Sequence, residues 1–165
     1  MIKEFNSLLA ALDAEKQKSP WISPLAQIWR DMPKEKKIFT NELLSALTDS
    51  LTVSDEHRLN QLLGIAMMDG LDTRFVPIFC RLLTVHWHRS HEDLVDMLGE
   101  IADEQAVDCV YKTALDVPPY DEGRALARKC IWALKDIGTS DAFDRLKLLA
   151  QSEDPIIKET AMLNL

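Results

Sequence analysis

The residues with the clearest chemical potential are seven acidic side chains between Arg89 and Lys112, a stretch without lysine or arginine. They are Glu92, Asp93, Asp96, Glu100, Asp103, Glu104 and Asp108. Asp93, Asp96, Glu100 and Asp103, which we call the acidic ridge, have the spacing of one helical face. Because like charges so spaced disfavour a helix by roughly 0.2–0.5 kcal/mol per pair, another role should retain them. The acidic ridge is therefore either a contact strip for a basic partner or a solvated face that keeps the chain soluble.

A tryptophan on the polar side of a helical pattern is the second candidate. The apolar stripe of this pattern consists of Leu126, Cys130, Ala133, Leu134 and Ile137. Trp132 projects almost opposite the stripe, beside Arg128 and Asp136. An exposed tryptophan next to an arginine is typical of an interface anchor. The alternative is that a neighbouring helix covers Trp132, since this residue type is usually largely buried.

Other candidate chemistry is weaker. The spacing of His86, His88 and His91 could suit a metal ion, but no cysteine accompanies them, so an exposed loop is the simpler interpretation. Met67 and Met68 are expected to pack in the core rather than to form a cofactor site. The motifs GxSxG, HExxH, GxxxxGK[ST] and GxGxxG do not occur. We therefore expect no enzymatic activity, no metal and no cofactor.

Charge and composition narrow the classes of partner. The formal net charge is −8, and residues 41–120 alone contribute −9. An acidic chain repels phosphate backbones, so we expect a basic protein partner rather than nucleic acid. No apolar run reaches the roughly 20 residues that a membrane span needs, and the start of the chain lacks the features of a secretory signal. Cys80, Cys109 and Cys130 each lie in an apolar helical pattern, which predicts buried thiols in a cytoplasmic protein.

The elements that must position these residues are helices. Apolar residues recur at spacings of three and four along most of the chain, and alternation typical of strands is not sustained anywhere. Turn and cap residues divide the pattern into about ten helices in antiparallel pairs. We expect helices at about 2–18 and 21–29, from the basic cluster Lys34, Lys36 and Lys37, at 54–70, 72–85, 90–102, 104–116 and 121–138, and on both sides of Asp154 and Pro155.

The last two thirds of the chain contain an internal repeat with an offset of 36 residues. This offset relates Leu98, Ile101, Ala102, Ala106, Val107, Asp108 and Ala114 to Leu134, Ile137, Gly138, Ala142, Phe143, Asp144 and Ala150. A helix pair of this length cannot bury its apolar face alone, so the repeat predicts a stacked α-solenoid. We expect a single domain over 1–165, with irregular helices over 1–53 and repeats over 54–165.

These residues resemble the HEAT family in its short bacterial form, related to the phycobilin-lyase repeats. The second helix of that repeat is matched at its front by Asp154, Ile157, Lys158, Ala161 and Leu165, and at its back by Leu126, Cys130, Ala133, Leu134, Ile137 and Gly138; Leu98, Gly99 and Ile101 repeat the back half. The resemblance implies an all-α, right-handed α-α superhelix. It also implies that the second helix of each pair lines the concave surface, which would place the acidic ridge there.

Three functions are compatible with this architecture. Small acidic HEAT-like proteins resemble the immunity proteins that neutralise basic bacterial toxins, many of them nucleases. Asp93, Asp96, Glu100, Asp103, Arg128 and Trp132 would then bind the partner. The HEAT-like DNA glycosylases are the enzymatic alternative, with Trp132, Arg128 and one ridge carboxylate at the site, although the central negative charge opposes DNA. A chaperone-like lyase for tetrapyrroles follows from the repeat subtype alone. Fold by itself does not choose among them.

Overall fold

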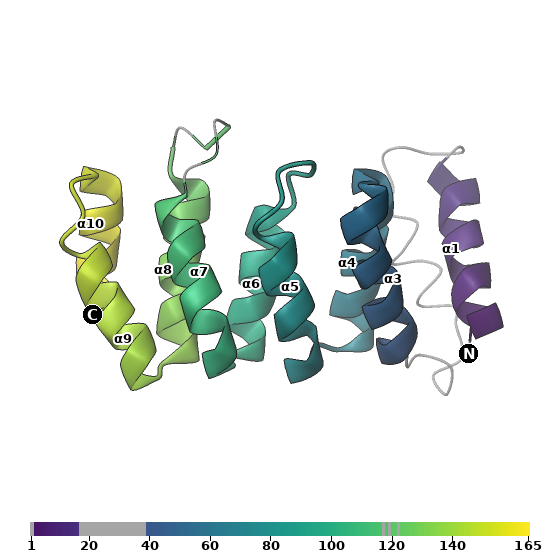
Figure 1. Ribbon diagram of the computed structural model, residues 1–165, viewed down its shortest axis with the longest axis horizontal. Coiled ribbons are helices and arrows are strands. Elements are labelled where there is room, and N and C mark those ends of the chain that lie inside the picture. The colour runs from purple at the N-terminus through teal and green to yellow at the C-terminus, as the bar shows by residue number, and fades with distance from the viewer. Residues whose placement is uncertain (1, 17–38, 117, 119, 122) are drawn as a thin grey trace. The chain divides into compact units, whose positions relative to one another are not determined.

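The computed structural model describes residues 2–16, 39–116, 118, 120–121 and 123–165. All regular secondary structure in these residues is helical, as expected, and comprises nine α-helices and two short 3-10 helices (Figure 1). The expected helix at 21–29 and the basic cluster Lys34, Lys36 and Lys37 lie outside the described residues. No helix in the described part of the chain has the length and apolar character needed to cross a membrane. The chain divides into two compact units, Met1–Gly70 and Leu71–Leu165, and each is described by itself.

The described residues of the first unit form three helices: α1 (Ile2–Lys16), α3 (Thr40–Val53) and α4 (Glu56–Asp69). The buried side chains Phe5, Leu8 and Leu12 of α1 recur at the spacing of one helical face. Asp55, rather than Ser54, caps α4: its carboxylate accepts the N–H of Arg58 at 3.0 Å.

The expectation that Met67 and Met68 pack in the core is wrong. Both side chains are exposed, whereas Ile65 and Ala66 of the same helix are buried. Met67 follows Leu59 and Leu63 at a spacing of four residues, but the buried stripe of α4 ends one residue earlier, at Ala66.

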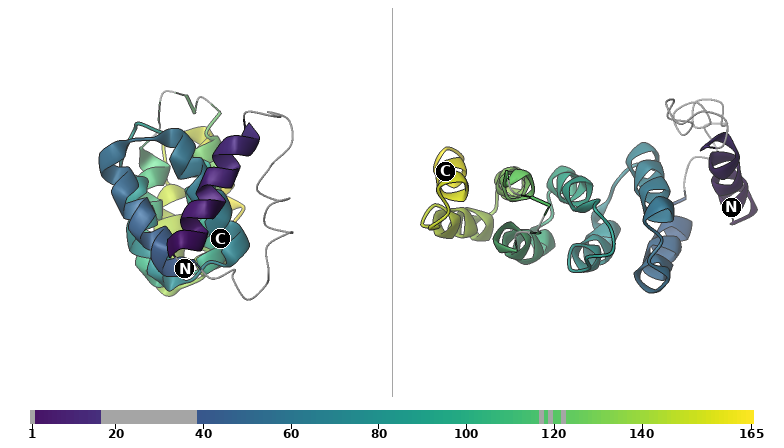
Figure 2. Two further views of the ribbon diagram at one scale, coloured as in Figure 1. Left: turned by 90° about the vertical axis from the view of Figure 1, so that its right-hand side faces the viewer. Right: turned by 90° about the horizontal axis from the view of Figure 1, so that it is seen from above.

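The second unit is a two-layer stack of three helix pairs. One layer consists of α5 (Val76–Leu82), α7 (Val107–Leu115) and α9 (Ser140–Leu149); the other consists of α6 (His91–Ile101), α8 (Ala125–Ile137) and α10 (Pro155–Met162). The 3-10 helices Thr73–Phe75 and Glu104–Ala106 lead into α5 and α7. Figure 2 shows the two layers from above, and α8 packs against α6, α7, α9 and α10. Apolar faces that one pair cannot bury alone are thus covered by the next pair.

The 36-residue repeat corresponds to repeated backbone geometry. Ala102 and Gly138 end α6 and α8 in the left-handed conformation, with φ of 53° and 67°. Each donates its N–H to the fourth residue back, Leu98 or Leu134, both fully buried. The alignment of these two stretches in the sequence is therefore confirmed as a structural equivalence.

Side-chain caps fix the starts of several helices. Asp154 accepts the N–H of Ile156 and Ile157 at the start of α10, as its position before Pro155 predicted. Asp121, the expected cap of α8, binds the N–H of Ala125 at 2.6 Å and that of Leu126 at 3.1 Å. Ser90 with Asp93 has the spacing of a capping box at the start of α6, but the Ser90 side chain makes no cap hydrogen bond.

Helices α6 and α8 approach each other closely at a glycine. A Cβ added to Gly99 would lie 3.1 Å from the Cα of Ala133 and 3.2 Å from its Cβ. The missing side chain therefore lets the two backbones come together, and it fixes how the exposed sides of α6 and α8 are placed next to each other.

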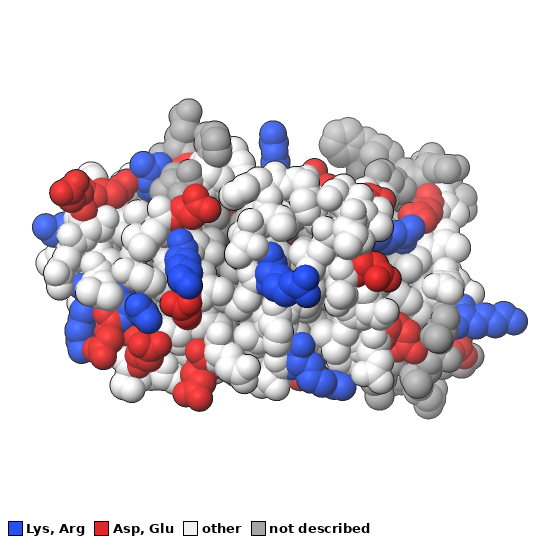
Figure 3. Space-filling view, in the orientation of Figure 1, with Lys and Arg blue, Asp and Glu red and all other residues white. Residues whose placement is uncertain are grey.

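On the other layer, charges of both signs are interspersed. Figure 3 looks onto this layer, and red and blue side chains alternate over α7 and α9. Lys112 pairs with Asp108 at 2.6 Å, and Lys147 pairs with Asp144 at 2.8 Å. Arg145 lies 3.7 Å from Asp108 and stacks over Tyr111. Acidic groups on this layer therefore have basic neighbours.

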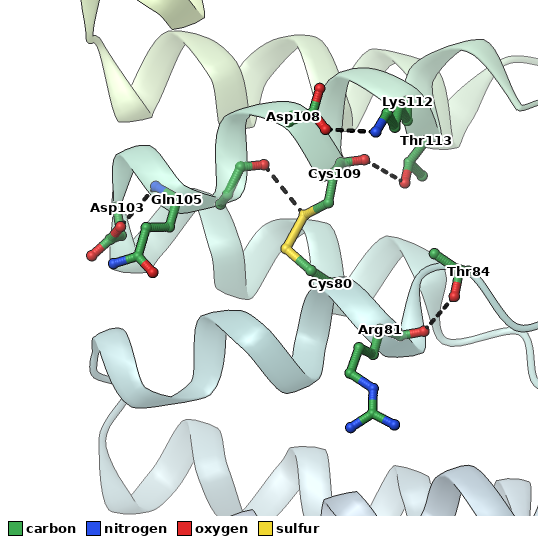
Figure 4. The surroundings of a disulfide bond; sticks show 10 residues. Cys80, Arg81, Thr84, Asp103, Gln105, Asp108, Cys109, Lys112 and Thr113 are labelled. Carbon is green, nitrogen blue, oxygen red and sulfur yellow. Dashed lines mark hydrogen bonds and ion pairs between the residues drawn. A yellow bond between two sulfur atoms is a disulfide. The ribbon is translucent and has the colours of Figure 1, made fainter.

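The expectation of three buried thiols is wrong for two of the cysteines. Cys80 of α5 and Cys109 of α7 form a disulfide, with their Cα atoms 5.6 Å apart (Figure 4). They are 29 residues apart in sequence but lie on successive helices of the same layer. Only Cys130 is a buried free thiol. Because disulfides persist mainly in oxidising compartments, the argument from reduced thiols to the cytoplasm no longer holds.

Candidate protein-binding face

The acidic ridge lies on α6 at three of its four expected positions. Asp93, Asp96 and Glu100 are exposed, whereas Leu94 and Leu98 on the same helix are fully buried. The polar and apolar faces of α6 thus separate as the spacing predicted. The carboxylates point away from the core of the second unit and are available to a partner.

Asp103 does not belong to this helical face, contrary to expectation. The helix ends at Ile101, and Ala102 turns the chain through the left-handed conformation. Asp103 then caps the following 3-10 helix, where its carboxylate accepts the N–H of Gln105 at 2.8 Å. The periodicity of the acids continues through this turn although the helix does not, so Asp103 has a structural role.

A lysine on α8 neutralises part of the ridge. The ammonium group of Lys129 lies 2.5 Å from Asp96 and 3.5 Å from Glu92. Burial alone would lower the pKa of Lys129, but the hydrogen bond to Asp96 and the charges of both carboxylates outweigh it and raise the pKa. Among the described residues, Asp93 and Glu100 have no basic partner, so they carry the uncompensated charge of α6.

Trp132 and Arg128 extend the same face onto α8. Trp132 is 48% exposed and Arg128 is exposed, so a neighbouring helix does not cover the tryptophan. The repeat offset equates Trp132 with Asp96, and both project from the solvent side of adjacent helices. We call Asp93, Asp96, Glu100, Arg128 and Trp132 the α6–α8 face.

The face continues as apolar surface on α10. Buried Cys130 of α8 corresponds to buried Ala161 of α10, an offset of 31 residues. The same offset relates Trp132 to Leu163, which is 78% exposed. Equivalent positions on α6, on α8 and immediately after α10 are therefore acidic, aromatic and aliphatic in turn. Sequence analysis missed both Lys129 and Leu163, although extending the repeat register to the last helix would have indicated Leu163.

The histidines pack against one another and do not form a metal site. His88 and His91 are buried; a ring nitrogen of His88 lies 3.1 Å from the carbonyl oxygen of Leu82 at the end of α5, and one of His91 lies 2.8 Å from that of Val85 in the following loop. Of His86, His88 and His91, only His86 is exposed, as expected for this loop. In the described part of the chain, no group of three histidine, cysteine, aspartate or glutamate side chains is placed to hold a metal ion.

Comparison with known proteins gives no relative. No protein-family model, curated protein or solved structure matches the chain. The resemblance to HEAT repeats therefore depends on the repeat residues themselves, and any function must be argued from the α6–α8 face.

Proposed function

We propose that this protein is a non-catalytic binding module that holds a basic protein partner on the α6–α8 face. One observation carries the proposal: three exposed carboxylates on α6, two without a basic partner in the described residues, lie beside the exposed Trp132 of α8. Interfaces commonly combine a desolvated aromatic anchor with surrounding charge complementarity.

The two parts of the face would contribute differently to binding. Asp93 and Glu100 would attract lysine and arginine side chains at long range and so accelerate association. Trp132 would be buried in the complex and slow dissociation, because large aromatic side chains carry much of the binding energy at interfaces. Arg128 supplies a hydrogen-bond donor at the edge of the tryptophan.

The more specific proposal concerns the class of protein. We infer that the helix pairs of the second unit form a right-handed HEAT-like superhelix, with α6, α8 and α10 on the concave side. An immunity protein that neutralises a basic nuclease toxin fits this arrangement, because an acidic surface can cover the site that nucleic acid would occupy. Support comes from the net charge of −8 and from the repeat residues.

The test is a comparative capture experiment. Wild-type protein and the variant Asp93→Lys, Asp96→Lys, Glu100→Lys are immobilised, and proteins retained from an extract of the source cells are identified by mass spectrometry. We expect the wild type to retain a protein rich in lysine and arginine that the variant does not retain.

The matched control reverses three acids near the opposite layer: Asp141→Lys, Asp144→Lys, Glu153→Lys. This variant changes the net charge by the same amount, so it should still retain the basic protein. Equal retention by all three baits, or retention of acidic proteins alone, would rule out the α6–α8 face as the binding surface.

A further inference from the structure

Two imidazole rings are stacked inside the second unit, where the α5–α6 loop meets the start of α6. The rings of His88 and His91 have centroids 4.4 Å apart and planes inclined by 23°. His88 is 2% exposed and His91 is 3% exposed. Histidine is the side chain whose ordinary pKa lies nearest to neutrality, so a buried pair of histidines can make the structure sensitive to pH.

Hydrogen bonds determine the tautomer of His88. Its Nε2 lies 3.1 Å from the carbonyl oxygen of Leu82, near the C-terminal end of α5. A carbonyl oxygen can only accept, so Nε2 carries the hydrogen. The Nδ1 atom accepts the backbone N–H of Ser90 at 3.2 Å, which leaves this nitrogen without a proton. The ring is therefore neutral.

Both ring nitrogens of His91 also have hydrogen-bond partners. Its Nε2 lies 2.8 Å from the carbonyl oxygen of Val85 and must donate to it. Its Nδ1 lies 2.7 Å from the hydroxyl of Tyr120, which donates to this nitrogen when the ring is neutral. Tyr120 belongs to the loop between α7 and α8, so the histidine connects two loops that are distant in sequence.

We propose that the stacked His88–His91 pair is a proton-operated latch, closed when both rings are neutral, that acidification opens. Opening would separate the His88 ring from the N–H of Ser90 and loosen the loop between α5 and α6. This proposal is independent of the partner proposed above, because it concerns neither the ridge carboxylates nor Trp132.

Protonation of His88 cannot be accommodated without breaking a contact, whereas protonation of His91 would reverse its hydrogen bond with Tyr120. A proton on Nδ1 of His88 would face the N–H of Ser90, and a backbone donor cannot become an acceptor. A proton on Nδ1 of His91 would require the Tyr120 hydroxyl to turn and give up its present donation. Protonating both would place two positive rings 4.4 Å apart in a buried site, at a high electrostatic cost.

Several charged and titratable groups of the described residues act on His91 or on Tyr120 beside it. Burial is the largest influence and lowers the pKa of His91, and the positive form of His86 lowers it further. The carbonyl of Val85 and the carboxylate of Asp116, just after α7, oppose this shift. On the side of Tyr120, the carboxylates of Asp121 and Glu92 act on the hydroxyl together with Arg89, which lies 6.0 Å from the ring. Geometry and electrostatics thus both favour the neutral ring.

The lowered pKa fixes the sign of the pH dependence. As pH falls below about 6.5, His91 of the unfolded chain takes up a proton before His91 of the folded chain does. The contribution of His91 to the free energy of unfolding is therefore fully present above pH 6.5. It is lost progressively as the pH falls to the pKa of His91 in the folded chain. The unfolding equilibrium constant should rise about tenfold for each unit that separates the two pKa values.

The experiment is nitrogen NMR of the imidazole rings in the full chain across a pH titration. We expect His88 and His91 to carry their proton on Nε2 at pH 8, and His91 to titrate below pH 6.5. Exchange of the Ser90 amide hydrogen, corrected for its intrinsic pH dependence, should accelerate over the same range. An Nδ1–H tautomer for either ring, or an unshifted titration of His91, would overturn the proposal.

A pair of tyrosine variants distinguishes the latch from simple packing. Tyr120→Phe removes the donor to His91 and should raise the titration midpoint of His91 toward 6.5, because the neutral ring loses its hydrogen bond. Tyr111→Phe, on α7 beneath Arg145, should leave the midpoint unchanged. Equal midpoints in both variants would contradict the role of Tyr120.

Discussion

Trp132 and Leu148 are both 48% exposed, yet they lie on opposite layers of the second unit. Equal exposure gives them a similar and small role in stability, since neither completes the core. If the α6–α8 face binds the partner, the two residues should differ sharply in binding. They therefore form a matched pair for separating the two contributions.

We predict that Trp132→Ala weakens binding of the captured partner about 30-fold, or about 2 kcal/mol, as expected for a buried aromatic anchor. Its free energy of unfolding should change by less than about 1 kcal/mol. Isothermal titration calorimetry and urea denaturation measure the two quantities.

Leu148→Ala should bind the partner as tightly as the wild type. Like Trp132→Ala, it should change the free energy of unfolding by less than about 1 kcal/mol. If both variants bind as tightly as the wild type, Trp132 is an exposed residue without a role in recognition.

Single residues also show where sequence reasoning succeeds and fails. The position of Trp132 opposite the apolar stripe left open whether a neighbouring helix covers it, and its 48% exposure decides for the exposed alternative. Asp103 has the spacing of the acidic ridge but lies beyond the end of α6. The end could not be predicted, because the residue in the left-handed conformation is Ala102 and not a glycine. The pairing of Lys129 with Asp96 depends on contact between two helices, which periodicity within one helix does not reveal.

At the level of elements, Gly99 determines how closely α6 and α8 pack. Replacing it with valine would place a branched side chain within about 3 Å of the backbone of Ala133. We predict a loss of about 1–3 kcal/mol in the free energy of unfolding, the usual cost of overpacking. Urea denaturation followed by circular dichroism measures this loss.

Gly123→Val is the control, because nothing lies within 4 Å of a Cβ added there. This variant should stay within about 0.5 kcal/mol of the wild type. A Gly99→Val protein of wild-type stability would mean that α6 and α8 are not in close contact.

The disulfide joins α5 to α7 and should stabilise the second unit by constraining the unfolded chain. For a separation of 29 residues, the loop-entropy relation gives about 3–4 kcal/mol. Cys80→Ser should therefore lower the free energy of unfolding by this amount under non-reducing conditions.

Adding a reductant should bring the wild type down to the stability of Cys80→Ser. Identical stability of the two proteins without reductant, together with two alkylatable thiols at Cys80 and Cys109 in the wild type, would show that the bond does not form.

For the whole molecule, the spacing of apolar residues was the most informative property of the sequence. The helical content and the helix pairs after residue 54 followed from apolar spacing and caps, because repeats depend on local contacts. Cys80 and Cys109 could not be paired in advance, since helices α5 and α7 meet only when the second unit is assembled. The stacked histidines were equally hidden, because loop packing has no periodic signature.

The central claim is that the charge and the aromatic surface of the α6–α8 face together select a basic partner. The most direct test is the dissociation constant of the captured partner, measured from low to high salt. The partner should bind the wild type and the Asp141, Asp144, Glu153 control alike, with affinity falling as salt rises. The Asp93, Asp96, Glu100 variant should bind at least about tenfold more weakly at low salt, with little salt dependence left. Equal affinity and an equal salt dependence for all three proteins would contradict the claim.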